Sequence, residues 1–319
     1  MCIVLRSDTL TFPQNGAHGV RASWQELFAA SPDVLINASA HKTVVPVLDF
    51  AIGEGGLTIM AGPCSVESEA QLMATAHHVR RAGAQFLRGG AFKPRSSPYA
   101  FQGLGVEGLK LLVKAREETG LAIVTEVMSE NDVSLVAEYA DILQIGSRSM
   151  ENYSLLEAAA RSGRPILLKR GMVATIADML RSAQVIVANG NPNVILCERG
   201  IRTFETALRN TFDAAGIALL KQICRLPVIA DPSHACGHRD LVAALARIGI
   251  AAGADGLLVE VHPNPDKALS DGDQSLDFAE FEAMMTGLAP WIALRTVKAQ
   301  EGEADQHGSS GIHLMEALG

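Results

Sequence analysis

Short runs of aliphatic and β-branched residues alternate with longer amphipathic stretches along this chain, and the alternation repeats eight times. We predict strands at 57–61, 85–88, 122–126, 141–145, 165–169, 193–197, 227–231 and 256–260. Nearly continuous apolar strands are typical of parallel sheets that are buried on both faces, and parallel strands need a crossover between them. Eight such units predict an α/β protein of the (β/α)8 TIM barrel class, whereas a doubly wound open sheet explains eight even units less well.

The stretches between the predicted strands have the periodicity of amphipathic helices. We predict helices at 68–82, 105–119, 131–139, 152–162, 174–188, 205–221, 238–252 and 277–294. Residues suited to capping a helix start, and glycines suited to ending a helix, stand at several of these boundaries: Ser68, Asn131 and Asn152, and Gly83, Gly120 and Gly163.

Three parts follow from this pattern. Residues 1–42 are predicted to be an N-terminal extension, 43–297 the (β/α)8 barrel with an N-terminal hairpin, and 298–319 an irregular, polar C-terminal tail. The hairpin is expected at 44–53, where it can close the bottom of the barrel. Neither end is long enough to predict a separate folded domain.

Composition excludes several other classes of protein. The net charge of −8 argues against a nucleic-acid surface. No apolar run approaches the roughly 20 residues that span a bilayer, and the N-terminus does not resemble a secretory signal. Five widely spaced cysteines without a C-x-x-C pair do not suggest a disulfide framework, so we expect a reduced, cytoplasmic protein.

Four residues of metal-binding type lie at or after the ends of predicted strands. They are Cys64 in A-G-P-C-S, His234 in D-P-S-H, Glu260 in V-E-V-H and Asp271 in A-L-S-D-G. Singly, each has a structural explanation as a buried thiol, a solvated imidazole, a paired carboxylate or a turn residue. Because strand ends meet at one face of a barrel, their joint placement predicts a site for one divalent metal ion: manganese, iron, cobalt or zinc.

Cations accompany these residues at Arg88, Lys93, Arg95, Arg148, Lys169 and Arg199. Positive charge around a metal favours a small, highly anionic, phosphorylated substrate. Arg88, Lys93 and Arg95 belong to L-R-G-G-A-F-K-P-R-S-S-P (87–98), a stiff loop that can bind an anion at several points, although it could also be a solvated basic loop. Arg148 and Arg199 could instead pair with Glu126 or Glu198.

Lys169 admits two chemical interpretations. A buried barrel lysine can form a Schiff base with a carbonyl substrate. A lysine among phosphate-binding arginines acts instead as a fixed positive charge, and the neighbouring arginines and metal ligands favour this role.

The chain resembles the 3-deoxy-arabino-heptulosonate 7-phosphate (DAHP) synthase family, and most of all its small bacterial-type subgroup related to 3-deoxy-octulosonate 8-phosphate synthase. The resemblance covers residues 57–290, and its carriers include A-G-P-C-S-V-E-S, L-R-G-G-A-F-K-P-R, L-L-K-R-G, L-C-E-R-G-I-R-T-F-E, D-P-S-H, V-E-V-H-P and A-L-S-D-G-D-Q-S-L. It implies a transferase that condenses phosphoenolpyruvate with erythrose 4-phosphate and water and releases phosphate. This reaction is the first step of the shikimate pathway to chorismate and the aromatic amino acids.

The resemblance also implies residue roles. Cys64, His234, Glu260 and Asp271 are expected to hold the metal. The phosphoenolpyruvate carboxylate is expected among Arg88, Lys93 and Lys169, its phosphate among Arg148, Lys169 and Arg199, and the aldose phosphate at Lys93, Pro94, Arg95 and Ser96. Lys93, His234 and Cys64 form the expected catalytic set, with Lys93 donating a proton to the developing alkoxide. Whether the water is activated by the metal or by a glutamate stays open.

Three other functions remain as alternatives. The octulosonate synthase uses arabinose 5-phosphate, but its relatives carry K-A-N-R-S where this chain has K-P-R-S, which favours the four-carbon sugar. A non-catalytic regulatory barrel conflicts with the intact metal and cation sets. A Schiff-base aldolase would use Lys169.

The resemblance suggests a homotetramer or homodimer, with a separate regulatory partner as a further possibility. We expect the protein alone to be insensitive to aromatic amino acids, because its N-terminal extension is short. Cys236 lies two residues from His234, where it is either an ordinary loop cysteine or an oxidation partner of Cys64.

Overall fold

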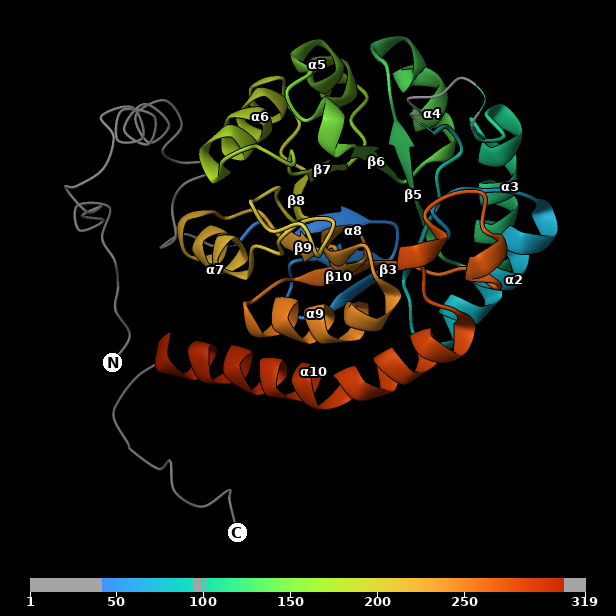
Figure 1. Cartoon of the computed structure of the whole chain (residues 1–319). Helices are drawn as coiled ribbons and strands as arrows, with labels where there is room; N and C mark the ends of the chain where they lie inside the picture. Colours follow the sequence, from blue (N-terminus) through green and yellow to red (C-terminus); the bar gives the residue numbers. More distant parts are fainter. Residues whose placement is uncertain (1–41, 94–98, 100, 307–319) are drawn as a thin grey trace.

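The computed structural model describes residues 42–93, 99 and 101–306, and its centre is a closed barrel of eight parallel strands (Figure 1). Around the barrel the strands follow the order β10-β3-β4-β5-β6-β7-β8-β9. Their bounds are β3 Thr58–Gly62, β4 Phe86–Arg88, β5 Ala122–Val127, β6 Ile142–Ile145, β7 Ile166–Lys169, β8 Val194–Glu198, β9 Val228–Ala230 and β10 Gly256–Glu260. The (β/α)8 prediction is confirmed, and each predicted strand coincides with an observed one to within one residue at either end.

Helices surround the barrel in the same order, and α10 passes beneath α9 at the lower edge of Figure 1. Their bounds are α2 Glu69–Arg81, α3 Val106–Thr119, α4 Val133–Tyr139, α5 Tyr153–Arg161, α6 Ile176–Ala188, α7 Ala214–Ile223, α8 Pro232–Cys236, α9 Arg239–Ala251 and α10 Phe278–Gln306. Single turns of 3-10 helix occur at η2 Glu130–Asp132, η3 Ser147–Ser149, η4 Pro265–Lys267 and η5 Gly272–Gln274.

Strand residues alternate between the inside of the barrel and the layer beneath the helices. Leu167 and Cys197 belong to the inner apolar cluster, whereas Leu168 and Leu196 belong to the outer one. The period of two follows from the pleat of a strand. It decides which of the polar residues at each strand end faces the mouth of the barrel.

The predicted hairpin is present as β1 Val45–Val47 and β2 Phe50–Ile52, paired antiparallel. Val45 and Ile52 are fully buried in the inner cluster of the barrel, and the rings of Phe50 and Phe86 lie 5.3 Å apart. Phe86 and the other barrel residues of this cluster include the first residues of their strands. The hairpin therefore closes the amino-terminal end of the barrel, as expected.

Truncating the buried face of this hairpin is expected to destabilise the fold without touching the site. Ile52→Ala should lower the free energy of unfolding by about 3 kcal/mol, because it leaves a cavity at the closed end of the barrel. Leu48→Ala is the matched control, since Leu48 lies in the same hairpin with 60% of its surface exposed. Urea denaturation would measure both; equal effects of the two changes would contradict a packed plug.

The amino-terminal ends of the strands are held by side chains that accept backbone hydrogen bonds. Gln85 accepts from the amide of Ile59 at 2.7 Å, and Asp141 accepts from the amide of Ile123 at 2.8 Å. Asp141 is also paired with Arg116 at 2.8 Å. These side chains satisfy backbone amides at the starts of strands, so their role is structural.

Three predicted boundaries are wrong. The helix predicted at 205–221 begins only at Ala214, because Ile201 pairs with Thr211 and the segment's amides bond to other chain segments. Asn131 lies within η2 and is not the cap of α4. α10 continues to Gln306, across the expected start of an irregular tail at 298, since the segment contains good helix formers. Ser68 and Asn152 do cap their helices, accepting from Gln71 and Leu155.

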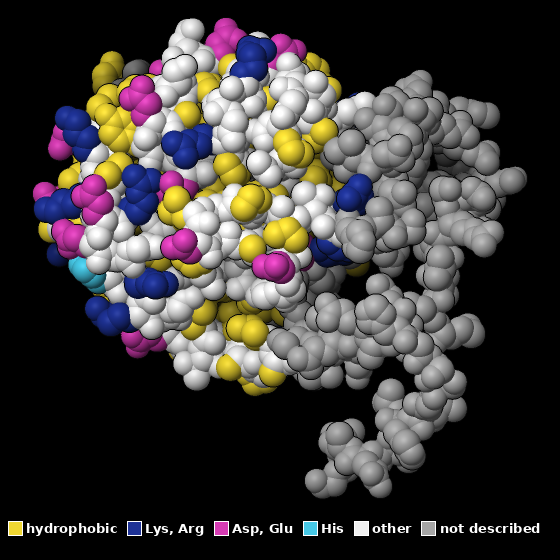
Figure 2. Space-filling model, turned by 180° about the vertical axis from the view of Figure 1, so that it is seen from behind, with side chains coloured by type: hydrophobic (Ala, Val, Ile, Leu, Met, Phe, Trp, Pro, Cys, Tyr) yellow, Lys and Arg dark blue, Asp and Glu magenta, His cyan; other side chains and the backbone are white. Residues whose placement is uncertain are grey.

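The surface opposite the view of Figure 1 carries charges of both signs. Figure 2 shows Lys and Arg side chains interspersed with Asp and Glu, with small apolar areas between them. This mixture is that of an ordinary solvated surface. Across the described residues, every helix is too short or too polar to cross a membrane.

Candidate active site

A cavity of about 230 Å³ opens at the carboxyl ends of the barrel strands. The side chains around it come from the ends of several strands and the loops that follow them. They are Arg88, Lys93, Glu126, Met128, Gln144, Gly146, Ser147, Arg148, Ser149, Lys169, Met172, Arg199, Arg209, His234 and Asp271. Most of the predicted cations therefore meet in one place, together with two of the predicted metal ligands.

Cys64 reaches the mouth through the sharp end of β3. Gly62 has a φ of +152°, and a Cβ there would overlap the carbonyl oxygen of Arg88, so the A-G-P-C sequence needs glycine at this position. Arg88 donates to the carbonyl oxygen of Pro63 at 2.7 Å. These contacts fix the turn that presents the Cys64 sulfur to Asp271 and Lys93, two residues of the cavity wall.

Three of the predicted metal ligands form one cluster. The ligand atoms of Cys64, Glu260 and Asp271 all lie within 4.8 Å of one another, and Cys64 Sγ is 3.1 Å from Asp271 Oδ2. His234 lies beside the cluster, with Nε2 3.4 Å from Glu260 Oε1. One sulfur, one imidazole nitrogen and carboxylate oxygens can all turn to a common centre, so the residues fit a divalent transition metal ion.

Asp271 is held opposite Cys64 by neighbouring contacts between two loops. The hydroxyls of Ser65 and Ser270 are 2.8 Å apart, and the amide of Leu269 donates to Glu67 at 2.8 Å. Asp271 itself has a φ of +50°, a left-handed conformation that is uncommon for a residue with a side chain. The strain at Asp271 is maintained by the surrounding contacts, as is common at functional positions.

Asp231 orients the imidazole of His234. Asp231 caps the short helix α8 by accepting from the amide of His234 at 3.0 Å, and it also lies 3.0 Å from ring atom Nδ1. A hydrogen bond at Nδ1 leaves Nε2 directed to Glu260 and available as a ligand. Burial lowers the pKa of His234, against the opposing charges of Asp231 and Glu260, so the neutral ring needed by a metal is favoured.

The carboxylates of the cluster stay ionised. Burial opposes this, but the Arg88 guanidinium lowers the pKa of Glu260, which accepts from Arg88 at 2.9 Å and from Gln274 at 2.5 Å. Asp271 is less buried; despite its desolvation, a hydrogen bond from the Cys64 thiol and the charge of Arg209 lower its pKa. Both groups are therefore ready to bind a cation at neutral pH.

The two lysines of the site have different neighbours. Lys93 Nζ lies 3.1 Å from Cys64 Sγ and donates to the Cys64 carbonyl oxygen at 3.0 Å, so it borders the metal cluster. Lys169 Nζ donates to Asp231 at 2.5 Å and lies 3.4 Å from His234 Nδ1. The amine of Lys169 is thus engaged in an ion pair, which suits a fixed cation better than a free nucleophile.

Arg199 is a buried cation whose guanidinium is only partly engaged. Its side chain is 4% exposed, and neither Nε nor Nη1 has a hydrogen-bond partner among the described residues. Burial lowers the pKa of Arg199, yet a guanidinium keeps its proton in proteins. The ion pair with Glu198 considered above is not formed, because Glu198 pairs with Arg170 at 2.9 Å. A buried guanidinium with unused donors at the wall of a cavity is suited to an anionic ligand.

Several residues of the site escaped the sequence analysis. Asp231, Gln274 and Arg209 contact predicted ligands, and Arg209 donates to Gln274 at 2.6 Å and to Asp271 at 3.4 Å. Gln144 donates to Glu126 at 3.2 Å within the cavity. Only Asp231 had a local signal, since Asp followed by Pro is typical of a capped helix start.

Not every predicted residue can be placed. Pro94, Arg95 and Ser96 lie outside the described residues. Arg148 lines the cavity from η3, where it is exposed. Cys236 is buried and its thiol donates to the carbonyl oxygens of Pro232 and His238, both at 3.2 Å. Neither of these contacts involves the metal cluster, which favours the interpretation of Cys236 as an ordinary buried cysteine.

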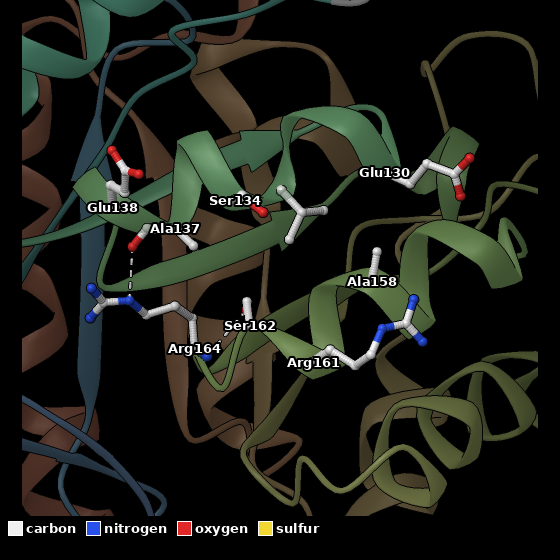
Figure 3. A pocket seen from close by; sticks show the side chains of 9 residues that line it. Glu130, Ser134, Ala137, Glu138, Ala158, Arg161, Ser162 and Arg164 are labelled. Atoms are coloured by element: carbon white, nitrogen blue, oxygen red, sulfur yellow. Dashed lines mark hydrogen bonds between the residues drawn. The ribbon is translucent and has the colours of Figure 1, made fainter.

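A second hollow, of about 490 Å³, lies between α4 and α5 (Figure 3). Glu130, Glu138 and Arg161 border it, and Arg164 donates to the carbonyl oxygen of Ala137 at 2.9 Å across one end. None of the predicted site residues lines this hollow. Size alone therefore does not identify the functional cavity of this barrel.

Comparisons with known proteins point to one family. The family model described as the DAHP synthetase I family matches residues 33–290. A phospho-2-dehydro-3-deoxyheptonate aldolase of Thermotoga maritima is 51% identical over 256 residues, which cover 80% of this chain and 76% of the relative. A 2-dehydro-3-deoxyphosphooctonate aldolase of Acidithiobacillus ferrooxidans is 35% identical over 245 residues, covering 71% and 86%.

Solved structures agree with the sequence comparisons. The crystal structure of the Thermotoga maritima DAHP synthase superposes with a TM-score of 0.79 at 50% identity, covering 80% of this chain and 75% of that one. A truncated form of the same synthase gives a TM-score of 0.78 at 45% identity, covering 85% and 98%.

Proposed function

The chain belongs to the DAHP synthetase I family, and from that membership we propose how the mouth of its barrel carries out the family's reaction. The protein is a transferase, a 3-deoxy-7-phosphoheptulonate synthase that joins phosphoenolpyruvate to erythrose 4-phosphate. The observation that carries the assignment of roles is one cavity that is lined both by Asp271 of the metal-ligand cluster, with His234 beside it, and by the buried, partly unengaged guanidinium of Arg199.

Phosphoenolpyruvate is proposed to bind along the basic wall of the cavity. Arg199, Lys169 and Arg148 take its phosphate, and Arg88, Lys93 and Lys169 take its carboxylate. The support for this arrangement is that all five side chains line the same cavity. Arg88, Lys169 and Arg199 are buried. Prearranged cations bind such a trianion at several points and hold it in one orientation.

The metal is proposed to be held by Cys64, His234, Glu260 and Asp271, as manganese, iron, cobalt or zinc. When bound, such an ion supplies a Lewis acid for the aldehyde oxygen of the sugar phosphate. Asp231 keeps His234 oriented for this task, and Gln274 and Arg88 keep Glu260 in place. The aldose phosphate itself is assigned to Lys93, Pro94, Arg95 and Ser96 by their sequence motif.

Lys93 is proposed as the proton donor. Carbon 3 of phosphoenolpyruvate forms a bond to the aldehyde carbon, and the aldehyde oxygen gains a negative charge that takes a proton from Lys93 Nζ. Burial opposes the charged amine, but neighbouring negative charge, that of Glu260 included, raises the pKa of Lys93, so it holds a proton to give. Water then adds to carbon 2 and loses one proton, which replaces the proton given by Lys93. The carbon–oxygen bond to phosphate breaks, and the remaining hydroxyl proton leaves with the phosphate, so that a ketone and inorganic phosphate result.

Phosphate release tests the reaction directly. The protein would be assayed with phosphoenolpyruvate and either erythrose 4-phosphate or arabinose 5-phosphate, first after chelation and then after addition of manganese. Metal-restored turnover with erythrose 4-phosphate alone is expected. Preference for arabinose 5-phosphate would identify an octulosonate synthase instead, and borohydride trapping at Lys169 would identify a Schiff-base enzyme.

Metal binding is expected to release one proton per ion. Burial and the nearby Glu260 raise the pKa of Cys64 to about 12, so the metal must displace a proton to obtain a thiolate. His234 is neutral and the carboxylates are ionised, so they add none. The apparent affinity should rise about tenfold per pH unit across neutral pH. Calorimetry in buffers of different ionisation enthalpy measures the proton count; uptake of metal without proton release would contradict a thiolate ligand.

Assembly, regulation and location are part of the same proposal. A homotetramer or homodimer that works in the cytoplasm is proposed from the family resemblance, with no aromatic amino acid inhibition of the isolated protein. Its four described cysteines are free thiols, which is compatible with a reducing compartment. Light scattering and inhibition assays with phenylalanine and tyrosine would test these points.

A further inference from the structure

A charged pair lies directly behind the phosphate-binding wall. Lys169 and Arg199 face the cavity, and the alternation of the strands directs their neighbours Arg170 and Glu198 to the other side, beneath the helices. There Arg170 Nη1 donates to Glu198 at 2.9 Å and to Asp213 at 2.7 Å. Both Arg170 and Glu198 are almost fully buried, with 4% and 0% exposure.

Glu198 also holds the turn that contains Arg199. Its second carboxylate oxygen accepts from the amide of Gly200 at 2.7 Å. Glu198 and Gly200 stand on either side of Arg199 in the sequence, so this bond closes the backbone around Arg199. Gly200 has a φ of +86°, and a Cβ there would lie 3.0 Å from the Cα of Ala235. The turn is therefore closed on one side by Glu198 and on the other by α8.

Arg170 joins this turn to the adjacent strand end and the next helix. Asp213 caps α7 through the amide of Gly216 at 2.7 Å while it accepts from Arg170. Arg170 Nε donates to the carbonyl oxygen of Ala174 at 3.0 Å, within the loop after β7. One guanidinium thus connects the end of β7, the end of β8 and the start of α7.

The pair also determines which cation stays available. Glu198 is adjacent to Arg199 in sequence, and an unpaired carboxylate there would compete with an anionic ligand for the guanidinium. Arg170 neutralises Glu198 on the outer side of the strands. The Nε and Nη1 donors of Arg199 are left without partners among the described residues.

We propose that Arg170 and Glu198 are positioning residues that hold Arg199 and Lys169 in place for the phosphate of phosphoenolpyruvate. Neither touches the substrate; they act through the turn at Gly200 and the two strand ends. The inference rests on the proposed binding of phosphoenolpyruvate at this wall.

The test compares Glu198→Gln with a matched control, Asp141→Asn. Asp141 is a buried carboxylate that also accepts from one arginine and one backbone amide, but at the amino-terminal end of the barrel. Calorimetry would measure the binding of inorganic phosphate and of phosphoenolpyruvate to each metal-loaded protein, and thermal unfolding would measure stability. Metal stoichiometry would be measured separately.

Glu198→Gln is expected to weaken phosphate and phosphoenolpyruvate binding about tenfold, because small displacements of a binding group have large effects. KM for phosphoenolpyruvate should rise more than kcat falls, and one metal ion per chain should still bind. Asp141→Asn should lose stability yet bind phosphate like the parent protein. Parent-like binding by Glu198→Gln, or an equal loss in Asp141→Asn, would overturn the inference.

A second pair of variants decides the matter if Glu198→Gln does not fold. Arg170→Lys keeps the positive charge behind the wall, whereas Arg170→Met removes it, so phosphate binding should weaken about threefold in the first and at least about tenfold in the second. Equal affinities in both variants and the parent would refute the positioning role. If the parent protein itself binds neither phosphate nor phosphoenolpyruvate, the proposed function fails instead.

Discussion

Cys64→Ala is expected to lower kcat by at least about a thousandfold, which corresponds to about 4 kcal/mol of lost transition-state stabilisation. The change removes the only sulfur in a cluster whose ligand atoms lie within 4.8 Å of one another. It also removes the sulfur 3.1 Å from Lys93 Nζ, so the proposed proton donor loses a neighbour that helps to place it. Steady-state phosphate release with added manganese, together with bound metal measured by atomic spectroscopy, checks both consequences.

Cys236→Ser is the matched control for this prediction. Cys236 is also a buried cysteine near His234, but its thiol donates to two backbone carbonyl oxygens, and serine can keep one such bond. The variant should retain metal and turnover, and should be no more resistant to air oxidation than the parent. Full activity of Cys64→Ala in metal-free buffer would refute the metal assignment. Loss of metal from Cys236→Ser would show that Cys236 contributes to the metal site.

Arg199→Met is expected to change binding and stability in opposite directions. Phosphoenolpyruvate affinity should fall at least about a hundredfold, because a desolvated charge-assisted contact to phosphate is lost. In phosphate-free buffer, however, the free energy of unfolding should rise by about 1 kcal/mol, since the parent buries guanidinium donors without partners. Calorimetric titration with phosphoenolpyruvate and urea denaturation measure the two effects on the same protein.

Arg116→Met is the control, because it should change stability and leave phosphoenolpyruvate binding unchanged. Arg116 donates to Asp141 at 2.8 Å, at the end of the barrel away from the cavity. Its removal should destabilise the protein and leave phosphoenolpyruvate binding unchanged, because it strands a buried carboxylate but touches no part of the site. Loss of stability in Arg199→Met would show that Arg199 has a structural role that the cavity does not suggest.

These expectations share a physical theme. Buried charges at the carboxyl end of the barrel are partnered unevenly: Lys169 is paired with Asp231, Arg170 with Glu198, and Arg199 has donors to spare. At the amino-terminal end, Asp141 and Gln85 instead complete backbone hydrogen bonds. Ligand-binding capacity is therefore found at the carboxyl end of the strands, as the barrel architecture favours.

The local sequence contains a signal for the buried position of Arg170. Arg170 follows Lys169, and a period of two places it beneath the helices, where a charge must find a partner. The helix boundary at Ala214 could not be found in this way, because the segment before it is held by Thr211, Asn210 and α8 rather than by its own propensity. Likewise, Asn131 is a good cap by type, but the chain turns through η2 at that point.

The sequence by itself determined the barrel, the closing hairpin and the identity of the residues at the strand ends. It could do so because the period of two in strands, the helical period and the turn residues are all properties of neighbouring positions. The placement of Cys64, His234, Glu260 and Asp271 at strand ends followed from the same local pattern.

Only the tertiary structure decided which of those polar and charged groups pair with one another. Lys169 contacts Asp231, which is 62 residues away in the sequence, and Cys64 contacts Asp271, which is 207 residues away. Such pairings depend on strand register and side-chain direction around the closed barrel, and a one-residue shift would reverse them. Which carboxylates are already neutralised, and which cations keep free donors, is therefore a property of the folded barrel alone.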